Sequence, residues 1–166
     1  GERDLCLVPY GGGTNVSGAL ALPKDDSRVF ASVDMRQMNK IVWLDEENFQ
    51  ACIEAGISGK ELERELSARG YTSGHDPDSV ELSTLGGWIA TNASGMKKNR
   101  YGNIEDIVLE ATLVAPTGEV ETLHPTPRNS VGVQPRGLLF GSEGNFGIIT
   151  KAVLKVHPQP QVREYG

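Results

Sequence analysis

The sequence predicts an α+β fold with a mixed and antiparallel sheet and flanking helices. Runs of strand length, either apolar or alternating between apolar and polar residues, recur along the 166-residue chain. Only one segment carries both a start and a stop signal for a helix, and a Pro-Thr-Gly turn separates two β-rich runs. A doubly wound parallel sheet would alternate strands with helices, so the pattern argues against that class.

The first third of the chain is predicted to be mainly strand. The apolar run 5–8 is stopped by Pro9 and is typical of a buried strand that leads into a glycine loop. Residues 29–33 and 41–44 predict a second and a third strand. Between residues 49 and 55, apolar and polar residues alternate, which predicts a half-buried antiparallel strand.

One helix is predicted directly after this strand. Ser58 and Glu61 have the spacing of a capping box, in which the two residues satisfy N–H groups of the first turn. Leu62 and Leu66 lie one turn apart and therefore share a face. The helix is expected to end at residues 69–70, where Arg is followed by Gly.

The last third again reads as strands. Residues 107–115 and 119–123 are β-rich and flank the turn 116–118, which predicts a hairpin. Residues 148–156 predict a further strand. The Pro-rich stretch 123–137 has little pattern and is expected to form a surface loop.

The composition excludes several classes of function. With 16 Lys and Arg against 22 Asp and Glu, the formal charge of −6 argues against a nucleic-acid partner, which needs clustered basic side chains. No apolar run approaches the roughly 20 residues of a membrane span. Cys6 and Cys52 have neither metal-binding nor redox spacing, so we expect no metal site and a reduced, cytoplasmic setting.

The 20 glycines are unusually many and gather at residues 11–18, 86–102 and 141–147. Three separate clusters indicate three stretches that line one elongated ligand. The loop 9–18 carries no charge, yet its consecutive glycines allow neighbouring N–H groups to converge on phosphate oxygens. This loop is therefore the first candidate for an anion site.

The loop does not match the best-known phosphate motifs. Gly13 and Gly18 have the spacing of a Walker A loop, but Ala19 and Leu20 follow where Lys and a hydroxyl residue are required. A dinucleotide fingerprint would need glycine in place of Val16. On pattern alone, the glycines are also compatible with an ordinary tight turn.

The second and third clusters have their own ambiguities. Ser83 or Thr84 is expected to cap a helix whose first turn offers free N–H groups to a diphosphate, with the small residues in 86–90 allowing close approach. A small-residue helix packed against a sheet would show the same pattern. Residues 141–150 predict a glycine turn entering a strand, which an ordinary turn with a bulge also explains.

Taken in order, these stretches carry a resemblance to a known family. The chain resembles the FAD-binding domains of the vanillyl-alcohol oxidase superfamily, also called PCMH-type, over nearly its whole length. The matching segments are residues 9–18, 77–79, 84–87, 91–95, 101–102, 141–144 and 147–150. Within that group, residues 95–106, with 74–79 and 38–41, are similar to the alkyldihydroxyacetonephosphate synthases, which act in ether-lipid synthesis.

The resemblance implies that the chain binds FAD. The residues that it assigns to the cofactor are Pro9, Tyr10, Gly11, Gly12, Gly13, Thr14, Asn15, Asp78, Ser79, Val80, Glu81, Leu82, Ser83, Thr84, Thr91, Asn92, Ala93, Ser94, Glu143, Gly144, Asn145, Phe146, Gly147, Ile148 and Ile149. In related proteins with covalently attached FAD, a His often follows the paired glycines. This chain has Thr14 there, which implies non-covalent FAD.

The resemblance also implies that the chain is part of a larger FAD-dependent enzyme. That enzyme would be a transferase that exchanges the acyl chain of acyl-dihydroxyacetone phosphate for a fatty alcohol, with the flavin as an electron sink and no net redox. In the family, a strand-helix unit would precede this region, and a substrate cap with the catalytic Tyr and His would follow it. We therefore expect residues 1–166 to form the FAD-binding domain alone, with no catalytic residue assigned.

Two departures keep other functions open. Asn92 stands where the animal synthases have Arg, and residues 145–146 are Asn-Phe where they have Thr-Leu. The alternatives are an FAD-dependent dehydrogenase or oxidase of D-2-hydroxy acids such as D-lactate or glycolate, a flavin-binding module without turnover, and a scaffold that binds nothing. The expected partners are FAD and a small-molecule or lipid-like substrate bound through another domain. The resemblance is also compatible with a homodimer and, for a eukaryotic synthase, a peroxisomal location.

The histidines and one basic cluster are the remaining candidates for chemistry. His75 precedes Asp76 and is expected in a surface turn, and His124 and His157 each precede a Pro in loop-like context. We assign none of the three to catalysis. The basic residues in 97–100 could attract a phosphorylated substrate, although a solvated charged loop explains them equally simply.

Overall fold

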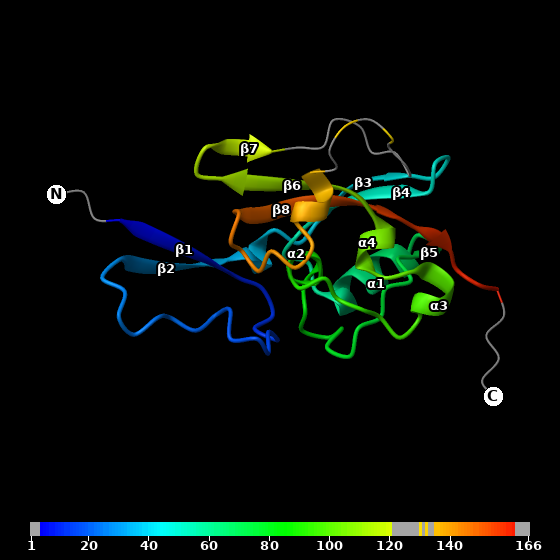
Figure 1. The fold of residues 1–166 in the computed structure, drawn as a ribbon. Helices are drawn as coiled ribbons and strands as arrows, with labels where there is room; N and C mark the ends of the chain where they lie inside the picture. The colour runs from blue at the N-terminus through cyan, green and yellow to red at the C-terminus, as the bar shows by residue number, and fades with distance from the viewer. Residues whose placement is uncertain (1–3, 121–129, 131, 133–134, 162–166) are drawn as a thin grey trace.

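The computed structural model describes residues 4–120, 130, 132 and 135–161, and its elements form two parts (Figure 1). One part is a parallel strand pair that projects from the rest. The other is an antiparallel sheet with helices on one face. The strands are β1 (Leu5–Tyr10), β2 (Val29–Asp34), β3 (Ile41–Asp45), β4 (Gln50–Glu54), β5 (Tyr71–Thr72), β6 (Val108–Ala115), β7 (Gly118–Val120), β8 (Ile148–Lys155) and β9 (His157–Pro158). The helices are η1 (Met35–Gln37), α1 (Gly59–Ser67), α2 (Leu85–Ala90), α3 (Lys98–Tyr101), α4 (Ile104–Ile107) and η2 (Pro135–Leu138).

The main sheet has the strand order β3-β4-β8-β6-β7, and every pair in it is antiparallel. This confirms the predicted strands and the hairpin between β6 and β7. The second hairpin strand extends to Val120, and its predicted end at residues 121–123 lies outside the described residues. Most of the predicted loop 123–137 also lies outside them, and its last residues form η2.

Strand β4 is antiparallel to both neighbours, as predicted, but its centre is buried on both faces and not on one alone. Ala51 and Ile53 face the helices, whereas Cys52 packs on the opposite face with Leu109 and Val153. The reason is position: β4 lies between β3 and β8, where neighbouring side chains cover both of its surfaces.

Strand β1 is longer and less buried than predicted. Leu5 and Leu7 are 58% and 48% exposed, so the expected buried strand was wrong. Among the described strands, β1 pairs only with β2, and two strands without a second layer leave one surface open. The strand also continues through Pro9 to Tyr10, because an edge strand tolerates a residue without an N–H.

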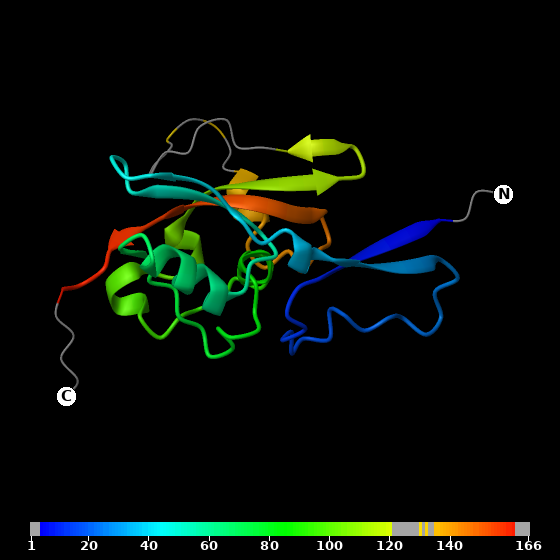
Figure 2. The same ribbon diagram turned by 180° about the vertical axis from the view of Figure 1, so that it is seen from behind.

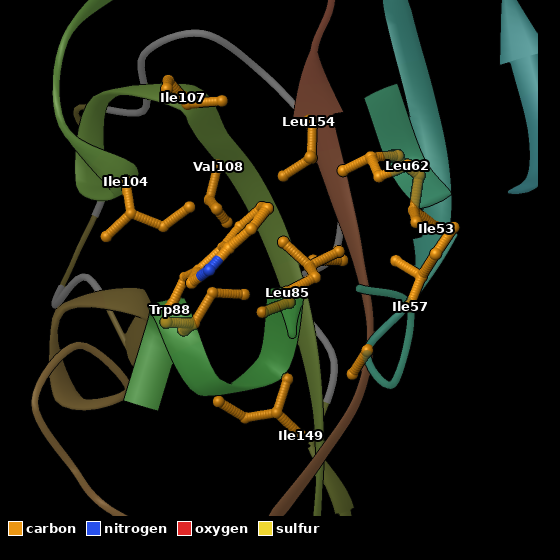
Figure 3. Close-up of a cluster of buried hydrophobic side chains, with 14 of the residues drawn as sticks. Ile53, Ile57, Leu62, Leu85, Trp88, Ile104, Ile107, Val108, Ile149 and Leu154 are labelled. Carbon is orange, nitrogen blue, oxygen red and sulfur yellow. The ribbon is translucent and has the colours of Figure 1, made fainter. Parts of the chain in front are cut away.

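The core lies between the main sheet and α1, α2 and α4, which cover one of its faces (Figure 2). Figure 3 shows the Trp88 side chain within this layer, with Leu85, Ile104 and Val108 around it. The indole Nε1–H of Trp88 donates to Ser83 Oγ at 2.7 Å. The buried indole therefore keeps its hydrogen bond, as a buried polar group requires.

Helix α1 confirms the predicted Ser58 cap and the buried face, whereas the Glu61 half of the predicted capping box is replaced by an ion pair with Arg64. Ser58 Oγ accepts the N–H of Glu61 at 3.3 Å, and Leu62 and Leu66 are fully buried. The helix ends at Ser67, and Gly70 follows with φ +82°, a backbone conformation that favours glycine. The local pattern was sufficient here because capping and the helical repeat both depend on residues within one or two turns.

Removing the cap of α1 should have a measurable cost. The substitution Ser58→Ala is expected to lower the free energy of unfolding by about 1 kcal/mol, because the Glu61 N–H loses its acceptor. Urea denaturation followed by circular dichroism measures this. Lys60→Ala, an exposed change on the same turn, is the control and should stay within about 0.5 kcal/mol. Equal losses in both variants would contradict the capping role.

Candidate functional site

A cavity of about 360 Å³ opens where the projecting strand pair meets the main part. Gly12, Ser83 and Gly144, one from each glycine-rich stretch, all line it. Three segments that are far apart in the sequence thus share one crevice, as the clustering of the glycines indicated. The volume falls within the range of small-molecule and cofactor sites.

The cavity brings together many of the residues that the sequence assigned to the cofactor. Those that line it are Pro9, Tyr10, Gly11, Gly12, Gly13, Thr14, Asn15, Ser79, Ser83, Thr84, Thr91, Ala93, Glu143, Gly144, Gly147 and Ile149. Those that lie outside its lining are Asp78, Val80, Glu81, Leu82, Asn92, Ser94, Asn145, Phe146 and Ile148. A motif is continuous in sequence, whereas successive residues of a turn or strand point in different directions.

Further lining residues were not assigned to the cofactor from the sequence, although some of them lie in the matching segments 9–18, 77–79 and 84–87. They are Val8, Val16, Ser17, Ala19, Leu20, Met35, Ala55, Pro77, Gly86, Gly87, Trp88 and Ala90. Met35 begins η1 and Ala55 follows β4, so the topology alone brings them to the site. Gly86, Gly87 and Ala90 were expected to allow close approach of a helix, and their small size was the only available signal.

The glycine loop packs too closely against its neighbours for side chains. A Cβ on Gly12 would lie 1.9 Å from the backbone oxygen of Leu82, and one on Gly11 would lie 2.3 Å from Thr84 Oγ1. The N–H groups of Gly11, Gly12 and Gly13 donate to no residue in the described part of the chain. These donors are therefore available to a ligand that accepts hydrogen bonds, and a phosphate fits that requirement.

The first turn of α2 does not offer the free N–H groups that the sequence predicted. The N–H of Leu85 donates to the Ile57 oxygen at 3.1 Å, and that of Gly86 to the Ala55 oxygen at 2.7 Å. Thr84 is the N-cap, and its Oγ1 accepts the N–H of Gly87 at 3.4 Å. The start of α2 lies against residues 55–57, which follow β4. The carbonyl oxygens of Ala55 and Ile57 accept the first N–H groups of the helix.

The third segment joins the site through the end of α2 and the glycine loop. The N–H of Glu143 donates to the Ala90 oxygen at 2.9 Å, at a φ of +46°. The Glu143 carboxylate accepts from Ser17 Oγ at 2.7 Å and from Asn15 Nδ2 at 3.1 Å through the same oxygen, Oε1. Residues 126 and 128 positions apart are thereby connected across the cavity.

The site is nearly free of charge. Glu143 is the one charged residue among the described lining residues, and no Lys, Arg or His belongs to them. Arg36 lies behind the site, 5.5 Å from the Tyr10 ring, and its guanidinium lowers the pKa of Asp34 to about 2 through their hydrogen bonds. A bound diphosphate must therefore rely on backbone amides for stabilisation.

His75 lies in the interior, so its predicted place in a surface turn was wrong. Its ring is 2% exposed and packs against Trp88 with the ring centroids 4.8 Å apart. Neither ring nitrogen has a hydrogen-bond partner among the described residues. Burial lowers the pKa of His75 to about 4, opposed by the negative charge of Asp76. The chain turns inward here because the Glu63 carboxylate accepts the Ser73 N–H at 3.0 Å.

His157 and the basic cluster 97–100 do not belong to the described lining of the cavity. His157 packs against Tyr101, and burial lowers its pKa, helped by the charges of Lys155 and Arg100. His124 lies outside the described residues. Lys97 forms an ion pair with Asp76 at 2.9 Å. Lys97 is therefore paired with a neighbouring residue, and no residue of the cluster 97–100 belongs to the described lining.

Two absences concern the residues that the structure describes. These residues contain no group of His, Cys, Asp and Glu side chains arranged to hold a metal ion. Within the same residues, no helix has the length and apolar character needed to cross a membrane.

Comparison with known proteins adds an independent finding. Residues 1–124 match the family described as "FAD binding domain". The chain is 46% identical to an alkyldihydroxyacetonephosphate synthase of Caenorhabditis elegans and 47% identical to that of Dictyostelium discoideum, each over 99% of this chain. It is also 36% identical to a D-lactate dehydrogenase of Anaerostipes hadrus over 96% of this chain.

Solved structures of alkyldihydroxyacetonephosphate synthase agree with the fold described above. Two of them match with TM-scores of 0.87 and 0.88, at 46% and 47% identity, and each match covers 95% of this chain. The chain spans 28% and 26% of the two synthase sequences, 33% of the dehydrogenase, and 29% and 28% of the two solved chains. The predicted α+β fold of an FAD-binding domain is confirmed.

Proposed function

The chain belongs to the FAD-binding domain family, and from this premise we propose that it is the FAD-binding part of a larger enzyme similar to alkyldihydroxyacetonephosphate synthase. FAD is its cofactor. The proposal places the cofactor in the cavity between the glycine loop, α2 and the loop 141–147. One feature supports this placement, the glycine loop itself. The N–H groups of Gly11, Gly12 and Gly13 have no partner among the described residues, and Gly11 and Gly12 lie too close to their neighbours for any side chain.

The cavity offers different chemistry to different parts of FAD. We assign the diphosphate to the N–H groups of Gly11, Gly12 and Gly13, which need no basic side chain to bind it. Apolar lining from Val8, Met35 and Ile149 suits an aromatic ring system and excludes water from it. The residues that the sequence assigned to the cofactor but that lie outside the lining would hold the lining residues in place and would not contact the cofactor.

The proposal includes non-covalent attachment. His and Cys are side chains that can link a flavin covalently, and neither residue type belongs to the described lining. Thr14, which follows the paired glycines, does line the cavity. Acid precipitation should therefore release yellow FAD from the loaded protein into the supernatant, whereas a covalent link would leave the colour in the pellet.

For the whole protein, we propose exchange of the acyl chain of acyl-dihydroxyacetone phosphate for a fatty alcohol. Bound FAD supplies an electron sink for such an exchange. The residues of this chain would bind and orient FAD and exclude water from it, and the groups that handle the substrate would come from other parts of the protein. The basis is similarity: identities to synthases of 46% and 47% stand against 36% to the D-lactate dehydrogenase.

Two measurements test the proposal at its two levels. Titration of the protein with FAD, FMN and ADP should show quenching of FAD fluorescence and a rise in melting temperature with FAD. If none of the three ligands changes the melting temperature, FAD binding by this chain is contradicted. For the whole protein, incorporation of a labelled fatty alcohol into an alkyl ether product is expected. Bleaching of the flavin by D-lactate without ether formation would favour the oxidoreductase alternative.

The same proposal extends to partners and location. It includes a small-molecule or lipid-like substrate bound through a second domain, and a homodimer of the whole protein. For the whole protein, the proposal also includes an N-terminal strand-helix unit and a substrate cap. The proposed location is the cytoplasm, or the peroxisome if the protein is a eukaryotic synthase.

A further inference from the structure

Two different kinds of contact hold the glycine loop, residues 11–18. Its first residues, Gly11 and Gly12, are fixed by close packing against residues 82–84. Its far end is tied by side chains. Among the described residues, the hydrogen bonds that join Asn15 and Ser17 to another segment both end on Glu143 Oε1.

Asn15 also organises the loop internally. Its Oδ1 accepts from the Ala19 N–H at 3.0 Å, while its Nδ2 donates to Glu143. Ser17 Oγ, whose single proton is shared with Glu143 Oε1, lies 3.1 Å from the same Oδ1. These contacts join residues 15–19 into one hydrogen-bonded unit that faces the third segment. Releasing Glu143 would free the whole far end and not a single side chain.

The backbone conformation of Glu143 indicates a role for its side chain. Its φ of +46° lies in the left-handed region, where glycine is more stable than any residue with a Cβ. Gly141 and Gly144 beside it also have positive φ values, of +77° and +85°, and are glycines as expected. A glutamate kept at a strained position points to a function for its carboxylate.

Charge leads to the same conclusion. A carboxylate in a cavity proposed for a diphosphate repels that ligand. Two donors from the loop contact Oε1, so the charge of Glu143 is held by Asn15 and Ser17 rather than left open to the ligand. Its N–H is anchored on the Ala90 oxygen, which fixes the carboxylate relative to α2.

We infer that Glu143 is a positioning residue that holds the far end of the glycine loop closed and thereby slows the release of bound FAD. This inference rests on the proposed function for its second half. The first half, the hold on the loop, concerns the protein alone. The two halves are therefore tested by separate measurements.

The hold on the loop is tested without ligand, by hydrogen exchange of the protein. Glu143→Ala is expected to raise exchange of the Ala19 N–H about tenfold, since Asn15, whose Oδ1 accepts that N–H, loses its link to Glu143. Glu143→Gln keeps an acceptor and should exchange like the parent protein. Glu143→Gly relieves the backbone strain, so it should keep or raise the melting temperature while still exchanging faster. Unchanged exchange in both Glu143→Ala and Glu143→Gly would overturn the inference.

The effect on FAD is tested by release from loaded protein, followed as the recovery of free-flavin fluorescence after dilution. Glu143→Ala and Ser17→Ala should each release FAD about tenfold faster, and the double variant should be no faster than Glu143→Ala, because both changes break the same contact. Additive effects would overturn the inference. Glu65→Ala on α1 is the control and should release FAD like the parent. If the parent protein binds no FAD but Glu143→Ala still exchanges faster, the hold on the loop is upheld and the proposed function is rejected.

Discussion

Replacing Gly12 with alanine is expected to weaken FAD binding by about a hundredfold or more. The added Cβ would lie 1.9 Å from the Leu82 backbone oxygen, a distance that no real contact permits. The loop must then move away from residues 82–84, and the N–H groups of Gly11 and Gly13 move with it. Losing two hydrogen bonds to a charged phosphate costs about 3 kcal/mol or more, which corresponds to this change in affinity.

The change is measured as the dissociation constant for FAD, together with the free energy of unfolding without ligand. Overpacking at Gly12 should also lower that free energy by about 1–3 kcal/mol. Gly18→Ala is the matched control in the same loop, because nothing lies within 4 Å of its Cβ position. Its φ of +83° should cost about 1–2 kcal/mol of stability, with FAD affinity nearly unchanged. If both variants lose FAD equally, close packing at Gly12 is not the cause.

Acidification from pH 7 to pH 4 is expected to remove about 3 kcal/mol of folding stability through His75 alone. Its pKa is about 4 in the folded protein and 6.5 for an ordinary His, so between these values the unfolded chain binds a proton that the folded chain does not. This contribution is therefore complete above pH 6.5 and is lost as the pH falls toward 4. Each unit of difference in pKa corresponds to about 1.4 kcal/mol.

The variant His75→Phe isolates this effect. A phenyl ring can take the place of the imidazole beside Trp88, because neither ring nitrogen has a partner among the described residues. Urea denaturation at several pH values should show a flatter dependence for the variant between pH 6.5 and 4. Carboxylates such as Asp34 lose their native interactions at lower pH in both proteins, so the difference between the two curves belongs to His75. Parallel curves would contradict the assignment.

Features that depend on near neighbours in the chain followed from the sequence. The capping residue Ser58 and the spacing of Leu62 and Leu66 predicted α1, because the helical repeat involves residues three or four apart. The turn 116–118 between two β-rich runs likewise predicted the hairpin of β6 and β7. These features depend only on residues that are close in the sequence, so distant parts of the chain do not alter the prediction.

Features that depend on distant neighbours could not be predicted in the same way. The residue types around Leu85 and Gly86 are typical of a helix start with free donors, but the carbonyl oxygens of Ile57 and Ala55 occupy those donors. His75 reads as a turn residue, yet the hydrogen bond from Ser73 to Glu63 helps to bring it beneath Trp88. In each case the deciding partner lies on another element.

The candidate site combines both kinds of information. By itself, the sequence determined where glycine allows close backbone approach, and the three glycine-rich stretches indicated a shared ligand site. Only the tertiary structure decided which residues line the cavity, since Met35 follows β2 and Ala55 follows β4, where its oxygen accepts the Gly86 N–H of α2. It also decided that Glu143 meets Asn15 across the cavity. Contacts between segments more than 100 residues apart depend on how the whole chain packs, and no local pattern encodes that geometry.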